Sequence, residues 1–543
     1  MKKLLTTMTA VGLFTSGIIS ATGAGAAPTA ASAGTQSASS SGYQPPPIVW
    51  GSCTSTNLQD AGATCGLLTV PVDYAKPSGE KIQLMVSRVA HKTSDATAQG
   101  VMLVNPGGPG GSGVGFARLG EFVPGGGGDP YDWIGFDPRG VGESLPALTC
   151  DDDYFAPGRP AYVPDTAQIK RQWWARTRQY ARDCASSTGA TILEHSKTTD
   201  SAQDMDSIRK ALGVEKINYY GFSYGTYLGQ VYATMFPERV RRFVFDGVVN
   251  PTDVWYDANL NQDVAFDENI GIFFDWVADH DAEYGLGTDG AALLAMYYDI
   301  LDQLTDEPLA NFGAAEWNDN FVGAGYYVYD WDLVAHMFAA AVDGDFGPAI
   351  DWYGDPTGPG SDNGYAIYDA VQCSDVSWTK SWGTWEKDSW AIHAVHPFLA
   401  WNNAWYNAPC RYWDAKPGTP VNVSGSRVAP ILLIAETHDA ATPYPGALEV
   451  RRRFPNAVLI EGVGGTTHSG SLSGVSCTDD RIAAYLLTGA LDSRKPGNQS
   501  DVECEPVPTP EATPVDAAAR QSGSSHYGLS ADLRKTIMRS VGH

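Results

Sequence analysis

Residues 219–226 read YYGFSYGT and carry the pattern Gly-x-Ser-x-Gly around Ser223. Residues 216–220 before it have the β-branched and aromatic content of a short buried strand, and residues 226–236 have the pattern of a helix that ends at a proline. A serine on such a strand-to-helix turn is strained, and glycines at 221 and 225 permit the turn because they lack a Cβ atom. Since a chain with 59 glycines also contains such patterns by chance, this setting, and not the pattern alone, predicts that Ser223 is a nucleophile.

A second glycine-rich turn lies upstream of this stretch. Residues 100–104 form a continuous apolar run typical of a buried strand, and NPGGPGGSG follows at 105–113. Such a turn allows backbone N–H groups to face a developing negative charge without obstruction by side chains. A phosphate-binding loop is a poor alternative, because the turn contains no lysine. A flexible linker is also disfavoured, because Pro106 and Pro109 stiffen the segment.

Further strands and helices alternate through the first half of the chain. Strands are expected at 82–89, 131–137 and 243–245, and helices at 171–185 and 201–212. The strand at 131–137 leads into GFDPRGVGES at 135–144. We expect Asp137 and Arg139 to form a structural ion pair that shapes this turn.

Residues 251–413 have a different composition, and we call them the cap. They contain 12 of the 16 tryptophans, and their apolar positions recur with a helical period, for example at 270–278 and 290–304. A mostly helical insertion between strands of an α/β sheet typically covers the active site. Most of the aromatic side chains are expected to pack within the cap itself.

The sheet pattern resumes after the cap, where two strands are each followed by a candidate catalytic residue. Asp439 follows the strand expected at 429–435, and His468 follows the strand expected at 457–460; a closing helix is expected at 480–487. Catalytic groups in open parallel sheets gather at the carboxyl ends of the strands. Serine is a poor nucleophile, so an imidazole must take its proton and a carboxylate must orient that imidazole.

The order Ser223, Asp439, His468 is the order of nucleophile, acid and base in α/β-hydrolases. The main rival for the acid is Asp246, which ends the strand after the nucleophile. The other nine histidines lie before the serine, in the cap, beside the proposed acid or in the tail. The sequence therefore predicts an α/β-hydrolase fold, with a mostly parallel sheet flanked by helices and a large helical cap inserted between strands.

Together, the motifs at 105–113, 135–144 and 219–226 and the loops around Asp439 and His468 resemble the secreted tripeptidyl aminopeptidase family. That family belongs to the α/β-hydrolase serine peptidases related to prolyl aminopeptidases, and the resemblance spans about residues 48–505. It implies removal of short peptides, expected to be tripeptides, from free N-termini. It also implies that backbone N–H groups of Tyr224 and of Gly107 or Gly108 form the oxyanion hole.

An exopeptidase must recognise a free α-ammonium group, for which a carboxylate is the natural partner. The cap offers several carboxylates, including Asp263, Asp267, Glu268 and Asp375. We take Glu268 and Asp375 as the candidates. For any one of them, an ordinary surface charge in so acidic a chain is the better interpretation.

The chain has the features of an exported protein. Residues 1–27 carry two lysines, an apolar run and a small-residue cleavage site, which is the pattern of a signal peptide and too short for a membrane span. Residues 28–44 resemble a disordered leader or propeptide. We divide the rest into a core at 45–250, the cap, a second part of the core at 414–505, and a proline-rich linker and tail at 506–543, where a short helix is possible near 530–541.

Eight cysteines fit an oxidising compartment. Their grouping suggests four bridges between sequence neighbours, although eight cysteines allow 105 pairings. The suggested pairs are Cys53 with Cys65, Cys150 with Cys184, Cys373 with Cys410, and Cys477 with Cys504. A metal site is disfavoured because the Cys-x-x-Cys and His-x-x-x-His spacings are missing.

With 36 basic and 62 acidic residues, the formal net charge is −26. This charge opposes binding to nucleic acid and to anionic membranes, and it favours a cationic substrate group. We therefore expect a secreted, monomeric serine aminopeptidase that needs no cofactor and no metal and takes peptide N-termini as substrates. The alternatives are a secreted carboxylesterase or lactone hydrolase on the same fold, and a non-catalytic peptide-binding protein.

Overall fold

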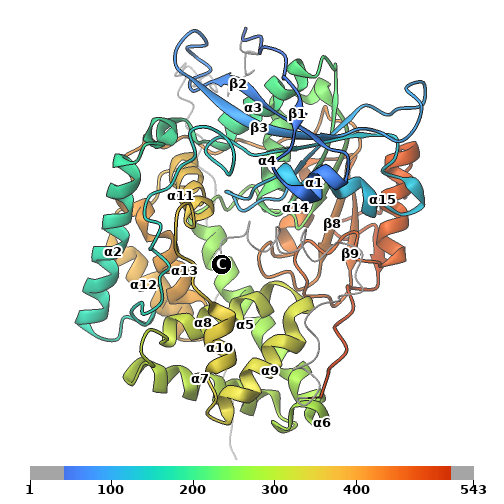
Figure 1. Cartoon of the computed structure of the whole chain (residues 1–543). Helices are drawn as coiled ribbons and strands as arrows, with labels where there is room; N and C mark the ends of the chain where they lie inside the picture. The colour runs from blue at the N-terminus through green and yellow to red at the C-terminus, as the bar shows by residue number, and fades with distance from the viewer. Residues whose placement is uncertain (1–41, 515–543) are drawn as a thin grey trace, which may run out of the picture. The chain divides into compact units, whose positions relative to one another are not determined.

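The computed structural model describes residues 42–514, which lie in one compact unit, Ser40–His543 (Figure 1). The predicted signal peptide, residues 1–27, lies outside the described residues. So do all but the last residues of the predicted leader and the tail beyond residue 514. Within the described residues, no helix is both long enough and apolar enough to span a bilayer.

A ten-stranded sheet organises the structure, in the order β1-β2-β3-β5-β4-β6-β7-β8-β9-β10. Strands β1 to β3 and β5 pair antiparallel with one another, and from β5 through β4 to β10 every pairing is parallel. The strands are β1 Gly51–Ser52, β2 Thr64–Pro71, β3 Lys81–Val89, β4 Val101–Asn105, β5 Asp132–Phe136, β6 Ile217–Phe222, β7 Val240–Asp246, β8 Leu432–Glu436, β9 Val458–Gly462 and β10 Val502–Cys504. This is the α/β-hydrolase architecture that the sequence predicted.

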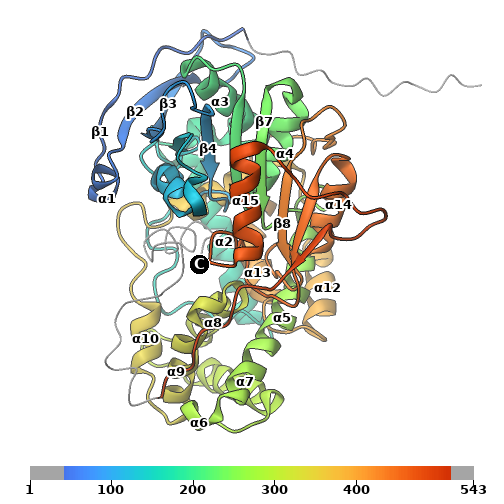
Figure 2. The same ribbon diagram turned by 90° about the vertical axis from the view of Figure 1, so that its right-hand side faces the viewer.

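Helices cover both faces of the sheet, because its central strands are buried on both sides. One face packs against the 3₁₀ segment η1 (Val114–Phe122) and α15 (Ser476–Thr488). The other packs against α3 (Thr198–Ala211), α4 (Tyr224–Met235) and α14 (Pro445–Arg453). Figure 2 shows α15 upright against the sheet.

The cap residues between β7 and β8 form helices and no named strand. Most of the buried aromatic residues of α5, α7, α8 and α9 join one hydrophobic cluster, which also contains residues of the sheet and of α15. Ring contacts such as Phe274–Phe321 and Trp317–Phe338 show packing within the cap, as expected. In Figure 1 α12 and α13 lie beside α2 (Ala167–Ser186). The cap helices are α5 Tyr256–Asp279, α6 Asp281–Tyr284, α7 Gly290–Asp306, α8 Ala314–Tyr326, η5 Val328–Asp330, α9 Trp331–Val342, α10 Gly347–Tyr353, α11 Asn363–Asp375, α12 Trp382–His393, α13 Ala400–Asn407 and η6 Ala408–Arg411.

All eight cysteines are paired in disulfides, and the pairs are the four neighbouring ones that the sequence suggested. Two of them link the ends of loops of 34 and 37 residues, so they hold together segments that are otherwise distant. The bonds are Cys53–Cys65, Cys150–Cys184, Cys373–Cys410 and Cys477–Cys504.

The expected ion pair between Asp137 and Arg139 is wrong. Asp137 accepts hydrogen bonds from Ser112 Oγ and from the backbone N–H groups of Gly113 and Glu143, at 2.7 to 3.0 Å. Arg139 instead forms a buried pair with Asp204 of α3, at 2.7 Å. Asp137 thus holds the glycine-rich turn against the end of β5. These partners lie 24 and 25 residues away in the sequence, so the residues next to Asp137 do not indicate them.

Candidate active site

Ser223 lies on the turn between β6 and α4, with backbone angles φ 54° and ψ −129°. These values are strained for a residue with a side chain. A Cβ atom at Gly221 would come within 2.6 Å of the carbonyl oxygen of Gly225, and one at Gly225 within 2.6 Å of that of Asn105. The turn therefore needs glycine at both flanking positions, as the sequence pattern indicated.

The glycine-rich turn after β4 lies directly against this serine. Gly107 has φ +100°, and a Cβ atom there would lie 2.8 Å from Ser223 Cβ and 3.0 Å from the backbone N of Tyr224. However, the Gly107 N–H donates to Asn105 Oδ1 at 3.1 Å. Of the two glycines named from the sequence, Gly108 is the one that also lines the adjacent cavity.

Tyr224 is the first residue of α4, so its backbone N–H has no acceptor within the helix. Among the described residues, neither the Tyr224 N–H nor the Gly108 N–H donates to another protein group. An oxyanion hole requires N–H groups that are free of protein acceptors and lie beside the nucleophile, and the Tyr224 N–H next to Ser223 has both properties.

Asp439 and His468 come together beyond the ends of β8 and β9. His468 Nδ1 lies 2.9 Å from each carboxylate oxygen of Asp439, and both side chains are fully buried. Thr442 holds the carboxylate through its N–H at 2.9 Å and its hydroxyl at 2.7 Å. The sequence did not reveal Thr442, which lies three residues after Asp439 in the same loop.

The other ring nitrogen of His468, Nε2, is buried and has no hydrogen-bond partner among the described residues. A Cβ atom at Gly247 would lie 2.8 Å from His468 Cε1, so the ring packs directly on this glycine. Asp246 immediately precedes Gly247, and its carbonyl oxygen accepts the Ser223 N–H at 2.9 Å. The Asp246-Gly247 segment therefore lies next to both Ser223 and His468.

Asp246, the rival for the acid, has a different role in the structure. Its carboxylate accepts the Ser471 N–H at 2.9 Å and the Ser471 hydroxyl at 2.6 Å. Burial raises the pKa of Asp246 to about 6, against the effect of these hydrogen bonds. The carboxylate that hydrogen-bonds His468 is that of Asp439.

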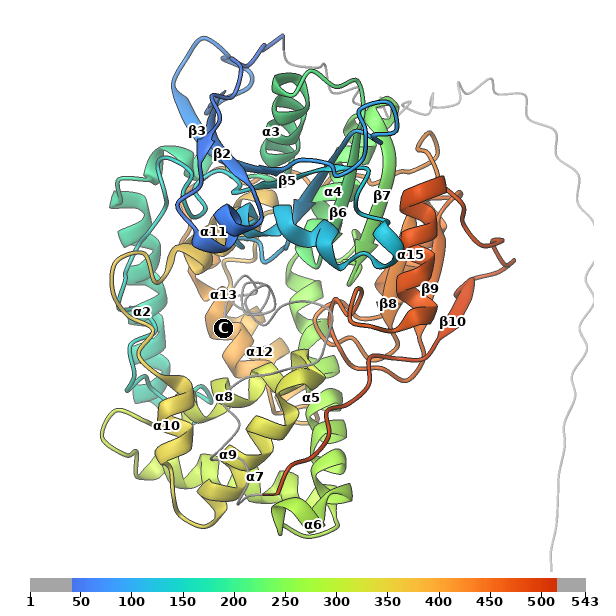
Figure 3. The same ribbon diagram turned by 45° about the vertical axis from the view of Figure 1, so that its right-hand side comes forward.

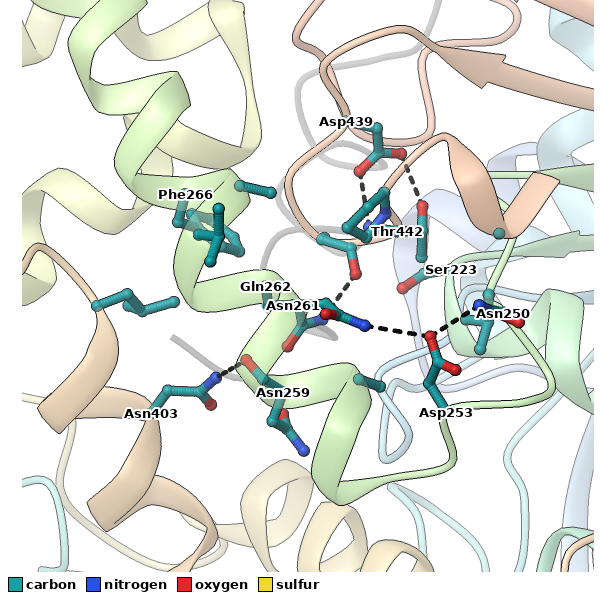
Figure 4. Close-up of a pocket in the computed structure, with 18 of the residues that line it drawn as sticks. Ser223, Asn250, Asp253, Asn259, Asn261, Gln262, Phe266, Asn403, Asp439 and Thr442 are labelled. Atoms are coloured by element: carbon teal, nitrogen blue, oxygen red, sulfur yellow. Dashed lines mark hydrogen bonds between the residues drawn. The ribbon is translucent and has the colours of Figure 1, made fainter. Parts of the chain in front are cut away.

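A cavity of about 460 Å³ opens beside Ser223 and is shown in Figure 4. Its size lies within the usual range of small-ligand sites. The wall combines core residues with cap residues from α5, α11 and α13, and it is rich in carboxamide side chains. These are Asn250, Asn259, Asn261, Gln262, Gln372 and Asn403.

The structure places the two candidate amine anchors differently. Glu268 lines the cavity and is exposed. Asp375 does not line it: its oxygens accept bonds from the Thr198 N–H and hydroxyl and from Trp255 Nε1. Burial raises the pKa of Asp375 to about 6.

Two other cap carboxylates also have internal partners. Asp263 accepts from Asn403 Nδ2 at 2.9 Å, and Asp267 accepts from the Phe398 N–H at 3.1 Å. Asp253, which the sequence analysis missed, does line the cavity and accepts from Asn250 and Asn261 (Figure 4). It lies in the short segment between β7 and α5, where no sequence pattern marks a binding residue.

One group of possible metal ligands occurs among the described residues, formed by Asp369, Cys373 and Cys410. Both cysteines belong to the same disulfide. They cannot supply thiolate ligands in this state, so the group does not fit a metal ion.

Two family models match the chain. One is described as an alpha/beta hydrolase fold and matches residues 100–328. The other is described as a TAP-like protein and matches residues 396–504, the region that contains Asp439 and His468.

Several proteins are similar over most of their length. A tripeptidyl aminopeptidase of Streptomyces coelicolor is 41% identical over 476 residues, covering 85% of this chain and 87% of that protein. The serine protease Hip1 of Mycobacterium tuberculosis is 32% identical, covering 82% of this chain and 89% of that protein. A protein of the same organism named carboxylesterase B is 31% identical, covering 81% and 88%.

Proposed function

Because the chain belongs to the tripeptidyl aminopeptidase family of α/β-hydrolases and is a serine hydrolase of the peptidase type, we propose that it removes tripeptides from free N-termini. The observation that carries the proposal is the buried, hydrogen-bonded pair of His468 and Asp439, together with a strained Ser223 at the wall of a cavity. Peptides are its substrates.

In the proposed first step, Ser223 Oγ attacks the carbonyl carbon of the third residue and passes its proton to His468 Nε2. Asp439 keeps the proton of His468 on Nδ1 and stabilises the imidazolium that forms. The N–H groups of Tyr224 and Gly108 stabilise the negative charge on the carbonyl oxygen. His468 then gives its proton to the departing nitrogen, which leaves as the amine of the shortened peptide.

In the second step, water attacks the acyl-enzyme. His468 takes a proton from the water and returns it to Ser223 Oγ, which releases the tripeptide as a carboxylic acid. Ser223 alternates between a free hydroxyl and an ester, so the cycle needs neither a metal nor a cofactor.

A carboxylate on the cavity wall would bind the substrate ammonium group. We propose Glu268 for this contact, with Asp253 as the second carboxylate of the cavity. Three extended residues span about 10 Å, so the distance between the anchor and Ser223 sets the length of the released fragment. Asp375 is the weaker candidate, because it lies off the cavity wall with its oxygens occupied.

We also propose export through the signal peptide at residues 1–27. The four disulfides support this, because such bonds persist in oxidising compartments.

The test uses one hexapeptide with its N-terminus free or acetylated, and mass spectrometry of the products. We expect loss of three residues from the free peptide alone, and no product with Ser223→Ala. Glu268→Gln should raise KM for the free peptide and leave turnover of a small acyl ester unchanged. Equal cleavage of the free and the acetylated peptide would contradict the aminopeptidase proposal.

The second candidate is a carboxylesterase, favoured by the relative of that name. It predicts turnover of acyl esters with no need for a free amine. Peptides left intact beside rapid ester hydrolysis would select this function over the first.

A further inference from the structure

The chain beyond β10 runs from the sheet to the cap, and we call residues 505–514 the strap. Figures 2 and 3 show it leaving β10 and reaching the lower cap helices. Near its start, Val507 is 5% exposed and packs in the hydrophobic cluster that includes α15 and the cap. Near its end, the N–H and the hydroxyl of Thr513 donate to Asp332 of α9 at 2.9 and 2.8 Å.

The first attachment point of the strap is Glu436, a residue with no part in the proposed reaction. It ends β8 three residues before Asp439 and is 6% exposed. One oxygen accepts the Val507 N–H of the strap at 2.7 Å. The other accepts the Thr467 N–H, also at 2.7 Å, immediately before His468.

The loop that carries His468, residues 463–471, is also held from the cap side. His468 donates its N–H to the carbonyl oxygen of Tyr326, the last residue of α8, at 2.8 Å. The Val328 N–H donates to the Thr467 hydroxyl at 3.3 Å. The loop therefore lies between Glu436 on the core and Tyr326 on the cap.

The second attachment point, Asp332, is also well satisfied. It accepts from Tyr284 at 2.7 Å in addition to Thr513. Burial raises the pKa of Asp332, but hydrogen bonds from His336, Tyr284 and Thr513 outweigh burial and lower the pKa to about 2. The carboxylate is thus charged at neutral pH, when its hydrogen bonds to the strap are strongest.

We propose that Glu436 is a positioning residue for His468, and that the strap is a tie that fixes the cap over the histidine loop. The proposal rests on the roles of Ser223 and His468 stated above. Glu436 links the histidine loop to the strap, because its carboxylate accepts the Thr467 N–H from the loop and the Val507 N–H from the strap. Loss of one acceptor leaves a buried N–H unsatisfied, which is more costly than the hydrogen bond itself.

The test compares Glu436→Gln with Glu505→Gln, an exposed glutamate of the strap. The readouts are kcat and KM for a small acyl ester, and labelling of Ser223 by a fluorophosphonate. We expect Glu436→Gln to lower kcat and the labelling rate about tenfold with KM within twofold, because the amide NH₂ cannot accept from a backbone N–H. Glu505→Gln should match the unmodified protein.

A second arm tests the strap itself. A protease site replaces residues 508–511, of which 508, 509 and 511 are exposed. Cleavage there leaves β10 on the main chain and separates it from Thr513. Cleavage should raise KM for the hexapeptide severalfold and leave kcat for the small ester within twofold. If Glu436→Gln does not fold, Val507→Pro removes the N–H that the strap donates to Glu436, together with the buried valine side chain, and should reproduce the effect of cleavage.

Equal labelling rates for Glu436→Gln and Glu505→Gln would overturn the positioning role. An unchanged peptide KM after cleavage would overturn the tie. Failure of the proposed function itself gives a different result. If the unmodified protein is not labelled at Ser223, the proposed function is contradicted, and this inference is contradicted with it.

Discussion

A single methyl group at position 107 would collide with Ser223, the proposed nucleophile. The Cβ atom of an alanine there would lie 2.6 Å from the Phe222 carbonyl oxygen and 2.8 Å from Ser223 Cβ, at a φ of +100°. We expect Gly107→Ala to lower kcat about 100-fold or more, comparable with the loss of an oxyanion donor. Gly115→Ala is the matched control, because no atom lies within 4 Å of its Cβ position. Steady-state kinetics would give kcat for both variants. Equal kcat values for Gly107→Ala and Gly115→Ala would contradict the close approach of the two turns.

The choice between two aspartates can be tested in the same way. Asp439→Asn should lower kcat by about 10⁴-fold, because an amide favours the wrong tautomer of His468. Asp246→Asn keeps an acceptor for Ser471 and should cost less than tenfold. The reverse ranking, measured on one peptide, would transfer the role of the acid to Asp246.

For single residues, the sequence predicts those candidate site residues that directly follow the end of a strand. Ser223, Asp439 and His468 each follow a strand, so their order and setting could be predicted. The contacts of Glu436 and Asp375 could not be predicted, because their partners lie 71 and 177 residues away in the chain. Arg139 shows the same limit: it pairs with Asp204 and not with the neighbour that the sequence suggested.

Among the elements, helix α5 carries a buried carboxylate whose ionisation destabilises the fold. Burial raises the pKa of Asp263 to about 8, although Asn403 donates one hydrogen bond to it. Because this pKa lies above the ordinary value of about 3.9, the stability gained from the neutral acid is present below pH 4. It is lost as the pH rises to 8.

Asp263→Asn should therefore melt a few degrees higher than the unmodified protein at pH 8 and at nearly the same temperature at pH 4. The asparagine keeps the acceptor for Asn403. Asp275→Asn, an exposed position on the same helix, should show no such pH-dependent difference. Thermal melting across this pH range measures the effect, and a constant difference would contradict it.

The disulfides differ in the length of chain that they close. Cys150–Cys184 closes 34 residues and ties the end of α2 to the segment after β5, whereas Cys53–Cys65 closes 12. Loop-closure entropy predicts a loss of about 4 kcal/mol for the first bond and about 3 kcal/mol for the second. Urea unfolding of the two double alanine variants would give the ranking, and a larger loss for the short loop would contradict the entropic account.

The length of the elements was harder to predict than their type. The sequence indicated a helix at 270–278, but α5 begins at Tyr256, because buried polar side chains such as Asn259 and Asp263 interrupt its apolar pattern. Strand β2 was not predicted, although it pairs with β3 over eight residues. The central parallel strands were found because burial on both faces gives them continuous apolar sequences.

For the whole molecule, the formal charge of −26 should attract cationic substrates. Raising the salt concentration shortens the Debye length from about 30 Å at 0.01 M to about 3 Å at 1 M. We expect kcat/KM for a lysine-rich peptide to fall severalfold over this range, whereas that for a small neutral ester stays nearly constant. Equal salt dependence for the two substrates would exclude electrostatic attraction as a factor in peptide selection.

The place where the cap is inserted in the sheet bears on whether the cap could be exchanged for another segment. Strands β7 and β8, which flank the cap, pair directly with each other, so the chain leaves the sheet and returns to it at adjacent positions. A helical segment of different size and shape could therefore be exchanged there without altering the strand order. Such a segment would change the wall of the cavity and leave the proposed nucleophile and base in place, provided that it also carries a new attachment site for the strap.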